Sequence, residues 1–169
     1  MAAVTAVAAQ ITVPLTPVPF TLQVLAVILS GLLLGARIGA LAQAVYVLVG
    51  AVGVPVFSGF TGGLGHVFGP TGGYLISYPI AAAVAGLAAQ SVARSPRRRA
   101  LLTALLWGYA GLAVIYVLGA TWLAVVAGLS PTEAIATGVL PFVGFDLIKV
   151  ALAALVAVAA APAIAPSRT

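Results

Sequence analysis

Long apolar runs, interrupted by proline, glycine and a few charges, limit what this chain can fold into. Of its 169 residues, 63% are apolar and only 5% are charged, whereas a soluble domain carries roughly a quarter charged residues. Seven Lys or Arg and two Asp or Glu side chains cannot cover a water-soluble surface. A soluble enzyme and a disordered chain are therefore both excluded. The sequence predicts a small protein that crosses a lipid bilayer several times.

Six apolar runs fit an all-α membrane fold. They cover about residues 2–12, 21–35, 38–52, 74–92, 100–126 and 143–163. Because about 20 apolar residues cross a bilayer as a helix, we predict one domain over residues 1–169, built from six transmembrane helices. The first run is the exception, since a helix of about 11 residues rises only about 17 Å.

The positions of the basic residues predict how these helices are oriented. Arg37 follows the second run, Arg94 and Arg97–Arg99 follow the fourth, and Arg168 follows the sixth. With six spans all of these positions lie on one side, which the positive-inside rule makes the cytoplasmic side. We expect both termini to be cytoplasmic and the connections after the first, third and fifth runs to face outward. The net charge of +5 forms no extended basic face, so no nucleic-acid partner is expected.

Two outward connections have an unusual composition. The first, Pro14–Gln23, is rich in proline, and the second, Val56–Tyr74, is rich in glycine. Irregular backbone at membrane depth is tolerated only where protein covers it or where it lines a cavity. The second connection is therefore either an exposed loop or the wall of a pocket, and it lacks the Lys-Ser or Lys-Thr of a nucleotide-binding P-loop. The predicted wall residues are Gly62, Gly63, Gly72 and Gly73, with Tyr74 as a stacking surface.

The two acidic residues have different predicted roles. Ser130, Pro131 and Glu133 have the spacing of a capping box at a helix start, which makes Glu133 structural. Asp146 is then the one carboxylate left for chemistry, and Lys149 lies on the same helical face three residues later. Charged residues inside a membrane helix are costly and usually mark a ligand or ion path. The pair is either a structural ion pair or a site shared with a ligand that has an acid at one end and an amide-like group at the other.

The remaining candidates are less specific. Cysteine is absent and His66 is the one histidine, so we expect neither a metal site nor a cofactor. Gln23 is either an interhelical hydrogen-bond partner or a ligand contact. Small residues at four-residue spacing, such as Ala2 and Ala6, pack either within the bundle or against a separate membrane protein.

Five ordered sequence blocks resemble the BioY family, the biotin-specific substrate-binding components of energy-coupling-factor transporters. The blocks are PVPFTLQ at 17–23, GLLLGARIGAL at 31–41, GVPVFSG at 53–59, GGLGHVFGPTGGY at 62–74 and FDLIK at 145–149. This resemblance extends from about Gln10 to Leu155.

The resemblance implies a six-helix bundle that captures extracellular biotin in a pocket closed by outward loops. Asp146 and Lys149 match the family positions that hold the ligand, and Thr61 matches a position that contacts the ureido ring in some members. The resemblance also implies a transmembrane coupling subunit, met through Ala2 and Ala6, and separate ATPases. The protein is then expected in the cytoplasmic membrane of a bacterium or archaeon. The alternative is a small membrane enzyme that uses Asp146 as acid or base.

Overall fold

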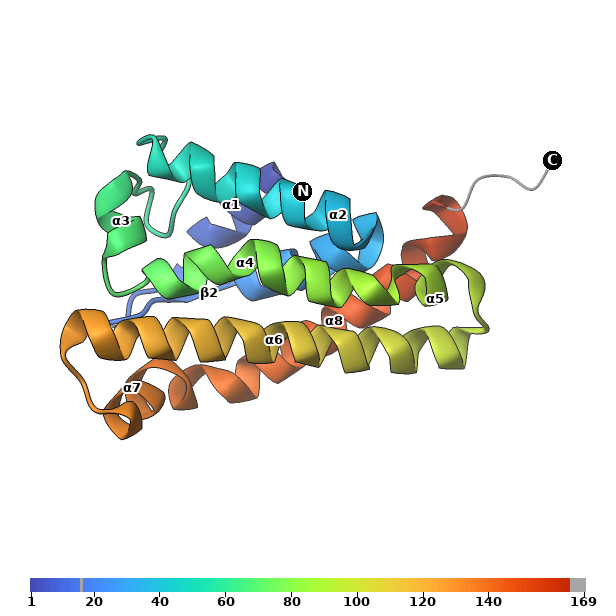
Figure 1. Ribbon diagram of the computed structural model, residues 1–169. Coiled ribbons are helices and arrows are strands. Elements are labelled where there is room, and N and C mark those ends of the chain that lie inside the picture. Colours follow the sequence, from blue (N-terminus) through green and yellow to red (C-terminus); the bar gives the residue numbers. More distant parts are fainter. Residues whose placement is uncertain (16, 165–169) are drawn as a thin grey trace.

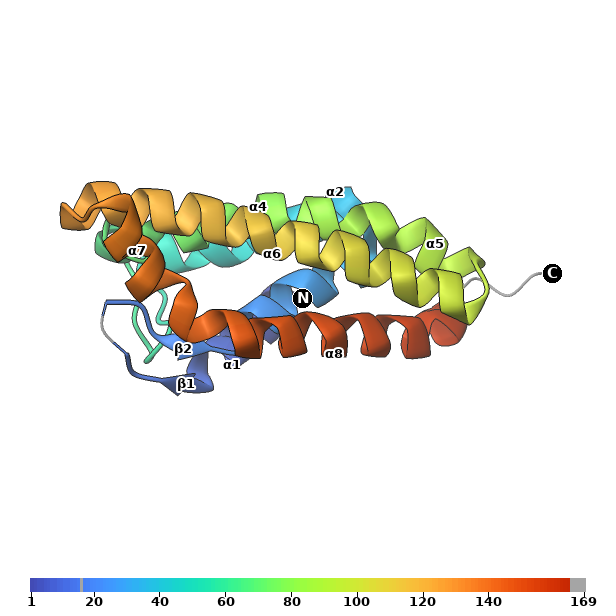
Figure 2. The same cartoon turned by 90° about the horizontal axis from the view of Figure 1, so that it is seen from below.

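The protein is an elongated bundle of helices (Figures 1 and 2). The computed structural model describes residues 1–15 and 17–164. In chain order its helices are α1 (Ala2–Gln10), α2 (Gln23–Ala51), α3 (Leu64–Phe68), α4 (Gly72–Ala85), the short 3-10 helix η1 (Gly86–Ala88), α5 (Ala89–Arg94), α6 (Arg97–Ala127), α7 (Pro131–Gly138) and α8 (Leu140–Ile164). Two short strands, β1 (Thr12–Val13) and β2 (Phe20–Thr21), lie between α1 and α2.

Four helical stretches in the described residues are long and apolar enough to cross a membrane. They are Gln23–Ala51, Gly72–Arg94, Arg97–Ala127 and Leu140–Ala161. The last three agree within a few residues with the predicted runs at 74–92, 100–126 and 143–163. The protein is thus a mostly helical, multi-pass membrane protein. Helix α1 is shorter than the predicted first run, with 9 residues. Arg168 lies outside the described residues.

Helix α2 contains both the second and the third predicted runs because it reverses direction at Gly35. Gly35 has φ 80° and ψ 172°, a combination that is open to glycine and strained for other residues. The two arms, residues 23–34 and 36–51, then run back along each other (Figure 1). A Cβ atom on Gly39 would lie 2.9 Å from the Gly31 Cα atom, and Ser30 Oγ donates to the Gly39 carbonyl at 3.5 Å. The glycine spacing in this segment therefore serves close packing inside the chain.

The proline-rich connection forms a small antiparallel hairpin, which the all-α prediction missed. Thr12 pairs with Thr21 and Val13 with Phe20. Proline fixes φ, lacks an N–H donor and pushes the residue before it into an extended conformation. Repeated prolines therefore keep this connection out of a helix. We call β1, β2 and the described residues between them the strap.

Helix α1 packs on the bundle with the side that carries its small residues. Ala2 and Ala6 lie against the core of this chain, and Thr5 on the same side exchanges hydrogen bonds with Gln43 of α2. The exposed side of α1 carries Val4 and Val7 instead. Ala2 and Ala6 are thus only partly buried against the core of this chain, and their contact with a separate membrane subunit stays a prediction.

The predicted capping box at the start of α7 is confirmed. The Ser130 hydroxyl accepts a hydrogen bond from the Glu133 backbone N–H, and the Glu133 carboxylate accepts one from the Ser130 backbone N–H at 2.9 Å. These bonds from Ser130 lower the pKa of Glu133 below its ordinary value of 4.5. Glu133 is thus occupied in starting a helix, as its spacing predicted.

Candidate functional site

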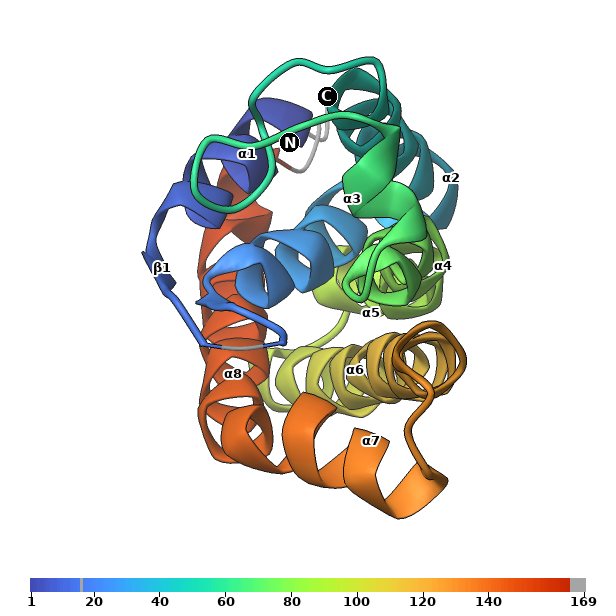
Figure 3. The same ribbon diagram turned by 90° about the vertical axis from the view of Figure 1, so that its left-hand side faces the viewer.

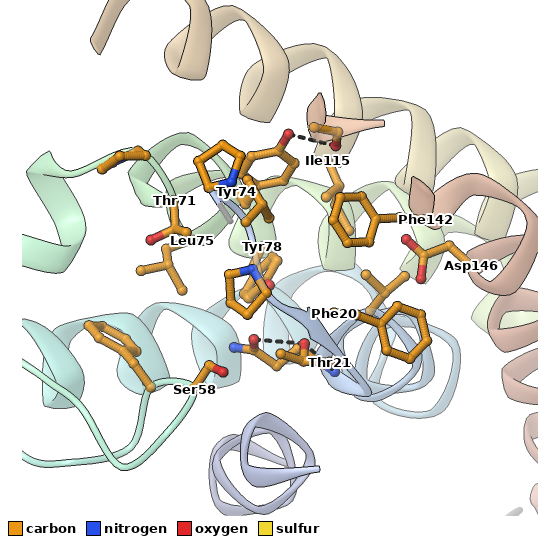
Figure 4. A pocket seen from close by; sticks show the side chains of 18 of the residues that line it. Phe20, Thr21, Ser58, Thr71, Tyr74, Leu75, Tyr78, Ile115, Phe142 and Asp146 are labelled. Carbon is orange, nitrogen blue, oxygen red and sulfur yellow. Dashed lines mark hydrogen bonds between the residues drawn. The ribbon is translucent and has the colours of Figure 1, made fainter. Parts of the chain in front are cut away.

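A cavity of about 310 Å³ opens at one end of the bundle. Its walls come from the strap, the glycine-rich loop, α4, α6 and the start of α8, and Figure 3 views the molecule from this end. This volume lies at the lower end of the range for small-molecule sites, roughly 300–1,000 Å³. Apolar and polar side chains both line it, and the polar ones come from segments far apart in the sequence (Figure 4).

Asp146 and Lys149 lie together in the cavity wall, one turn apart on α8. Lys149 Nζ and Asp146 Oδ1 are 2.6 Å apart, which confirms the prediction that the two side chains share a helical face. The two residues are only 3% and 5% exposed. Burying an ion pair is costly unless further hydrogen bonds satisfy both groups, so their other partners decide what the pair can do.

Each member of the pair has one further protein partner. The Tyr116 hydroxyl of α6 donates to Asp146 Oδ2 at 2.7 Å. Lys149 Nζ donates to the Thr21 carbonyl of the strap at 2.6 Å and lies 3.7 Å from the centre of the Phe20 ring. Sequence spacing could not reveal Tyr116 or Thr21 as partners, because Thr21 and Lys149 are 128 positions apart. The lysine thus fixes the strap to α8.

This arrangement leaves a defined set of hydrogen-bonding positions. A lysine ammonium has three donors, and a carboxylate can accept about four hydrogen bonds. Lys149 uses two donors and Asp146 accepts one bond on each oxygen. About two acceptor positions and one donor therefore stay available to a ligand. The charged pair is neutral overall, so it favours a polar, uncharged group.

Gln23 is a hydrogen-bond partner between segments of the bundle, while its role as a ligand contact stays a prediction. Its side-chain amide donates to the Tyr46 hydroxyl at 2.7 Å, and its carbonyl accepts from the Thr21 hydroxyl at 2.9 Å. It also lines the cavity. Gln23, at the start of the first arm of α2, therefore connects the strap with the second arm and presents a polar edge to the cavity.

The predicted loop residue Thr61 and the predicted stacking residue Tyr74 both line the cavity. The Thr61 hydroxyl donates to the Ser58 carbonyl at 2.9 Å, and the Tyr74 hydroxyl donates to the Gly138 carbonyl at 2.7 Å. The ring of Tyr74 also lies where a Cβ atom on Gly119 would be. Tyr74 is thus a fixed aromatic wall of the cavity.

The four predicted wall glycines do not line the cavity, so this part of the prediction is wrong. A Cβ atom on Gly62 would clash with the Val54 carbonyl, and one on Gly72 or Gly73 would clash with backbone or with Trp122. At these three positions the lack of a side chain allows close packing, whereas Gly63 has open space around it and a φ of 98° that favours glycine. The neighbouring threonines, Thr61 and Thr71, line the cavity instead.

His66 on α3 lies at the cavity with its ring edge-on to Phe57, 6.2 Å between centroids. Within residues 1–15 and 17–164, no group of three or more His, Cys, Asp or Glu side chains is placed to hold a metal ion. The expectation that biotin is the ligand, without a cofactor, stays a prediction at this point.

Fold and site together define a class: a multi-pass helical membrane protein with a ligand cavity at one end of its bundle. A family model described as the BioY family matches residues 1–166, so the chain belongs to the BioY family. The chain is 47% identical to the probable biotin transporter BioY of Pyrococcus horikoshii, over 92% of this chain and 88% of that protein. It is also 47% identical to the biotin transporter BioY of Thermotoga maritima, over 89% and 85%.

A solved structure shares the fold. The S-component for biotin from an ECF-type ABC transporter aligns with a TM-score of 0.81, covering 94% of this chain and 85% of that chain. The sequence identity between the two is 24%, so this comparison shows a common arrangement of the helices.

Proposed function

We propose that this protein captures biotin and serves as the substrate-binding component of an ECF-type transporter. The observation that carries the proposal is the buried Asp146–Lys149 pair in the wall of the cavity, with hydrogen-bonding positions left open. A cyclic urea has two N–H donors and one carbonyl acceptor. Its N–H groups flank the carbonyl and point apart, so one N–H fits an open acceptor position of Asp146 while the adjacent carbonyl fits the third donor of Lys149. The names of the relatives from Pyrococcus and Thermotoga support biotin as the urea in question.

The other predicted contacts fit the remainder of such a ligand. Tyr74 offers a flat apolar surface for a fused ring system, while Gln23 and Thr61 add polar edges to the wall. Because the charged pair is already neutral, a ligand carboxylate is better accommodated away from Asp146. This orientation places the urea of biotin at the charged end of the cavity.

Membrane topology and partners form the second part of the proposal. Leaving aside the short helices α3 and α7, we count α1, the two arms of α2, Gly72–Arg94, α6 and α8 as six segments. We propose that these six form one transmembrane bundle with both termini cytoplasmic. The reversal of α2 near Arg37 and the α5–α6 junction with Arg97–Arg99 lie at the end opposite the cavity (Figure 1), which the positive-inside rule places in the cytoplasm. Single cysteines at Ser95 and Ser58 should then be labelled from opposite sides of the membrane.

An energy source outside this chain is part of the same proposal. The sequence lacks the P-loop pattern that binds nucleotide phosphates, and the solved relative is described as part of an ABC transporter. We therefore expect a transmembrane coupling subunit and ATPase subunits, in the cytoplasmic membrane of a bacterium or archaeon. The alternative of a membrane enzyme is disfavoured because the relatives from Pyrococcus and Thermotoga are named as biotin transporters.

Calorimetric titration of the purified protein with biotin tests the proposal. Saturable binding with one biotin per chain is expected. Lipoate is the matched control ligand, because it has a sulfur-containing ring and the same acid tail but no urea. Equal affinity for lipoate and biotin, or no heat with biotin, would contradict recognition of the urea.

A further inference from the structure

The Tyr78 side chain is buried beside the cavity, yet its hydroxyl has no hydrogen-bond partner among the described residues. Tyr78 lies on α4 and is only 5% exposed. In the described part of the chain, every side-chain N or O atom that is shut off from open space has a hydrogen-bond partner. The Tyr78 hydroxyl must therefore face open space, and the cavity is the space that Tyr78 lines. Figure 4 shows Tyr78 between Thr71 at one side of the cavity and Asp146 at the other.

The other four tyrosines differ from Tyr78 in this respect. Tyr46 donates to the Val56 carbonyl, Tyr74 to that of Gly138, Tyr109 to that of Leu147 and Tyr116 to the Asp146 carboxylate. A buried tyrosine hydroxyl usually has a partner. An unsatisfied donor that points into a cavity is therefore a position where a ligand acceptor fits.

Packing fixes where this donor lies. The Tyr78 ring stacks on the Tyr46 ring, with centroids 6.4 Å apart and an interplanar angle of 25°. Tyr46 is itself held by hydrogen bonds from Gln23 and to Val56. A donor on a ring held in this way loses little freedom when a ligand binds, so its hydrogen bond contributes to affinity with little entropic cost.

We propose that the Tyr78 hydroxyl donates a hydrogen bond to the carbonyl oxygen of the urea group of the ligand, which makes Tyr78 a specificity-determining residue. The inference rests on the proposed function. When one urea N–H group meets Asp146, the adjacent carbonyl is brought to the same end of the cavity. A carbonyl oxygen accepts two hydrogen bonds, and the third donor of Lys149 supplies one of them.

This second donor explains how the site rejects ligands without a carbonyl at that position. Binding displaces water from the cavity, and a ligand that offers no acceptor leaves the Tyr78 hydroxyl buried and unpaired. Sites built to pair with a polar ligand group discriminate strongly against analogues that lack it. Tyr78 therefore selects for the urea head group rather than for the apolar rings or the acid tail.

The test is the change in biotin affinity of Tyr78→Phe, measured by calorimetry. This variant keeps the ring and removes only the hydroxyl, so the affinity should fall about tenfold. Tyr109→Phe is the matched control, because its hydroxyl bonds to Leu147 outside the cavity lining, and its affinity for biotin should stay within about twofold of wild type. Unfolding curves establish that both variants fold. Equal biotin affinity of folded Tyr78→Phe and wild type would overturn the inference.

Two biotin analogues locate the contact. In 2-iminobiotin a guanidinium group, which is protonated at neutral pH and has no acceptor, replaces the urea, so removing the Tyr78 hydroxyl should change the affinity for this ligand little. Biotinamide keeps the urea and alters the acid end, so Tyr78→Phe should lower the affinity for biotinamide as much as it lowers the affinity for biotin. The reverse pattern would place the contact at the acid end and overturn the assignment. Wild-type protein that fails to bind biotin would instead refute the proposed function itself.

Discussion

Lys149→Met provides a sensitive test of the charged end of the cavity. The substitution removes the 2.6 Å contact with Asp146 and the 2.6 Å hydrogen bond to the Thr21 carbonyl. Breaking a buried ion pair by removing one partner typically costs about 3–5 kcal/mol, because the other charge stays buried without compensation. Tyr116 still donates to Asp146, so we expect a loss near the lower limit, about 3 kcal/mol of unfolding free energy.

Biotin affinity should fall together with stability. The loss of one charged partner from a desolvated hydrogen-bonded pair costs on the order of 2–5 kcal/mol, or about 30-fold or more in affinity. We expect at least tenfold weaker binding in calorimetry, both for Lys149→Met and for Asp146→Asn. Both variants should still be recovered from the membrane fraction, because the helices that span the bilayer are unchanged.

The double variant Asp146→Leu with Lys149→Met separates stability from binding. Apolar residues in place of a buried ion pair are often neutral or stabilising, so the double variant should regain most of the lost unfolding free energy. Its biotin binding should stay lost, because neither partner of the urea is present. Thermal unfolding in detergent and calorimetry measure the two properties separately. Wild-type stability and wild-type affinity in both single variants would refute the reasoning, since the pair would then be irrelevant to fold and ligand.

Three further substitutions test other parts of the structure. Tyr116→Phe removes a hydrogen bond to a buried charge, so the unfolding free energy should fall by about 1.5–3 kcal/mol. Gly35→Ala should cost about 1–3 kcal/mol because of its positive φ, whereas Gly144→Ala in open space on α8 should not destabilise the protein in the same unfolding assay. The folded-state pKa of Glu133 is lowered, so its ionised carboxylate stabilises α7 above pH 4.5, and this stabilisation is lost on further acidification. Hydrogen exchange of the α7 amides should then become faster. Ser130→Ala should remove this pH dependence.

Local sequence patterns predicted those features that depend on neighbouring residues. The three-residue spacing of Asp146 and Lys149 placed both on one face of α8, and their 2.6 Å contact bears this out. The capping box at Ser130 was predicted for the same reason, since its partners lie within one helical turn. Apolar run lengths set the limits of the three long helices after residue 72 to within a few residues.

Features that depend on tertiary packing could not be predicted in this way. No spacing rule connects the Thr21 carbonyl or the Tyr116 hydroxyl with α8, because the fold alone brings them together. The glycines at 62, 63, 72 and 73 were assigned to the cavity wall from composition, yet 62, 72 and 73 serve close packing and 63 supplies a positive φ. The free hydroxyl of Tyr78 is visible only once the partners of the other tyrosines are known.

The bond between Lys149 and the strap has a consequence for the order in which the protein acquires its binding site. The ribosome makes the strap early, and the lysine that holds it follows 128 residues later. Until α8 enters the bilayer, the Thr21 carbonyl lacks this donor and the cavity lacks its charged end. A nascent or prematurely terminated chain therefore inserts most of its helices without acquiring any capacity to retain the ligand. The charged end of the cavity is completed in one step, when α8 joins the bundle.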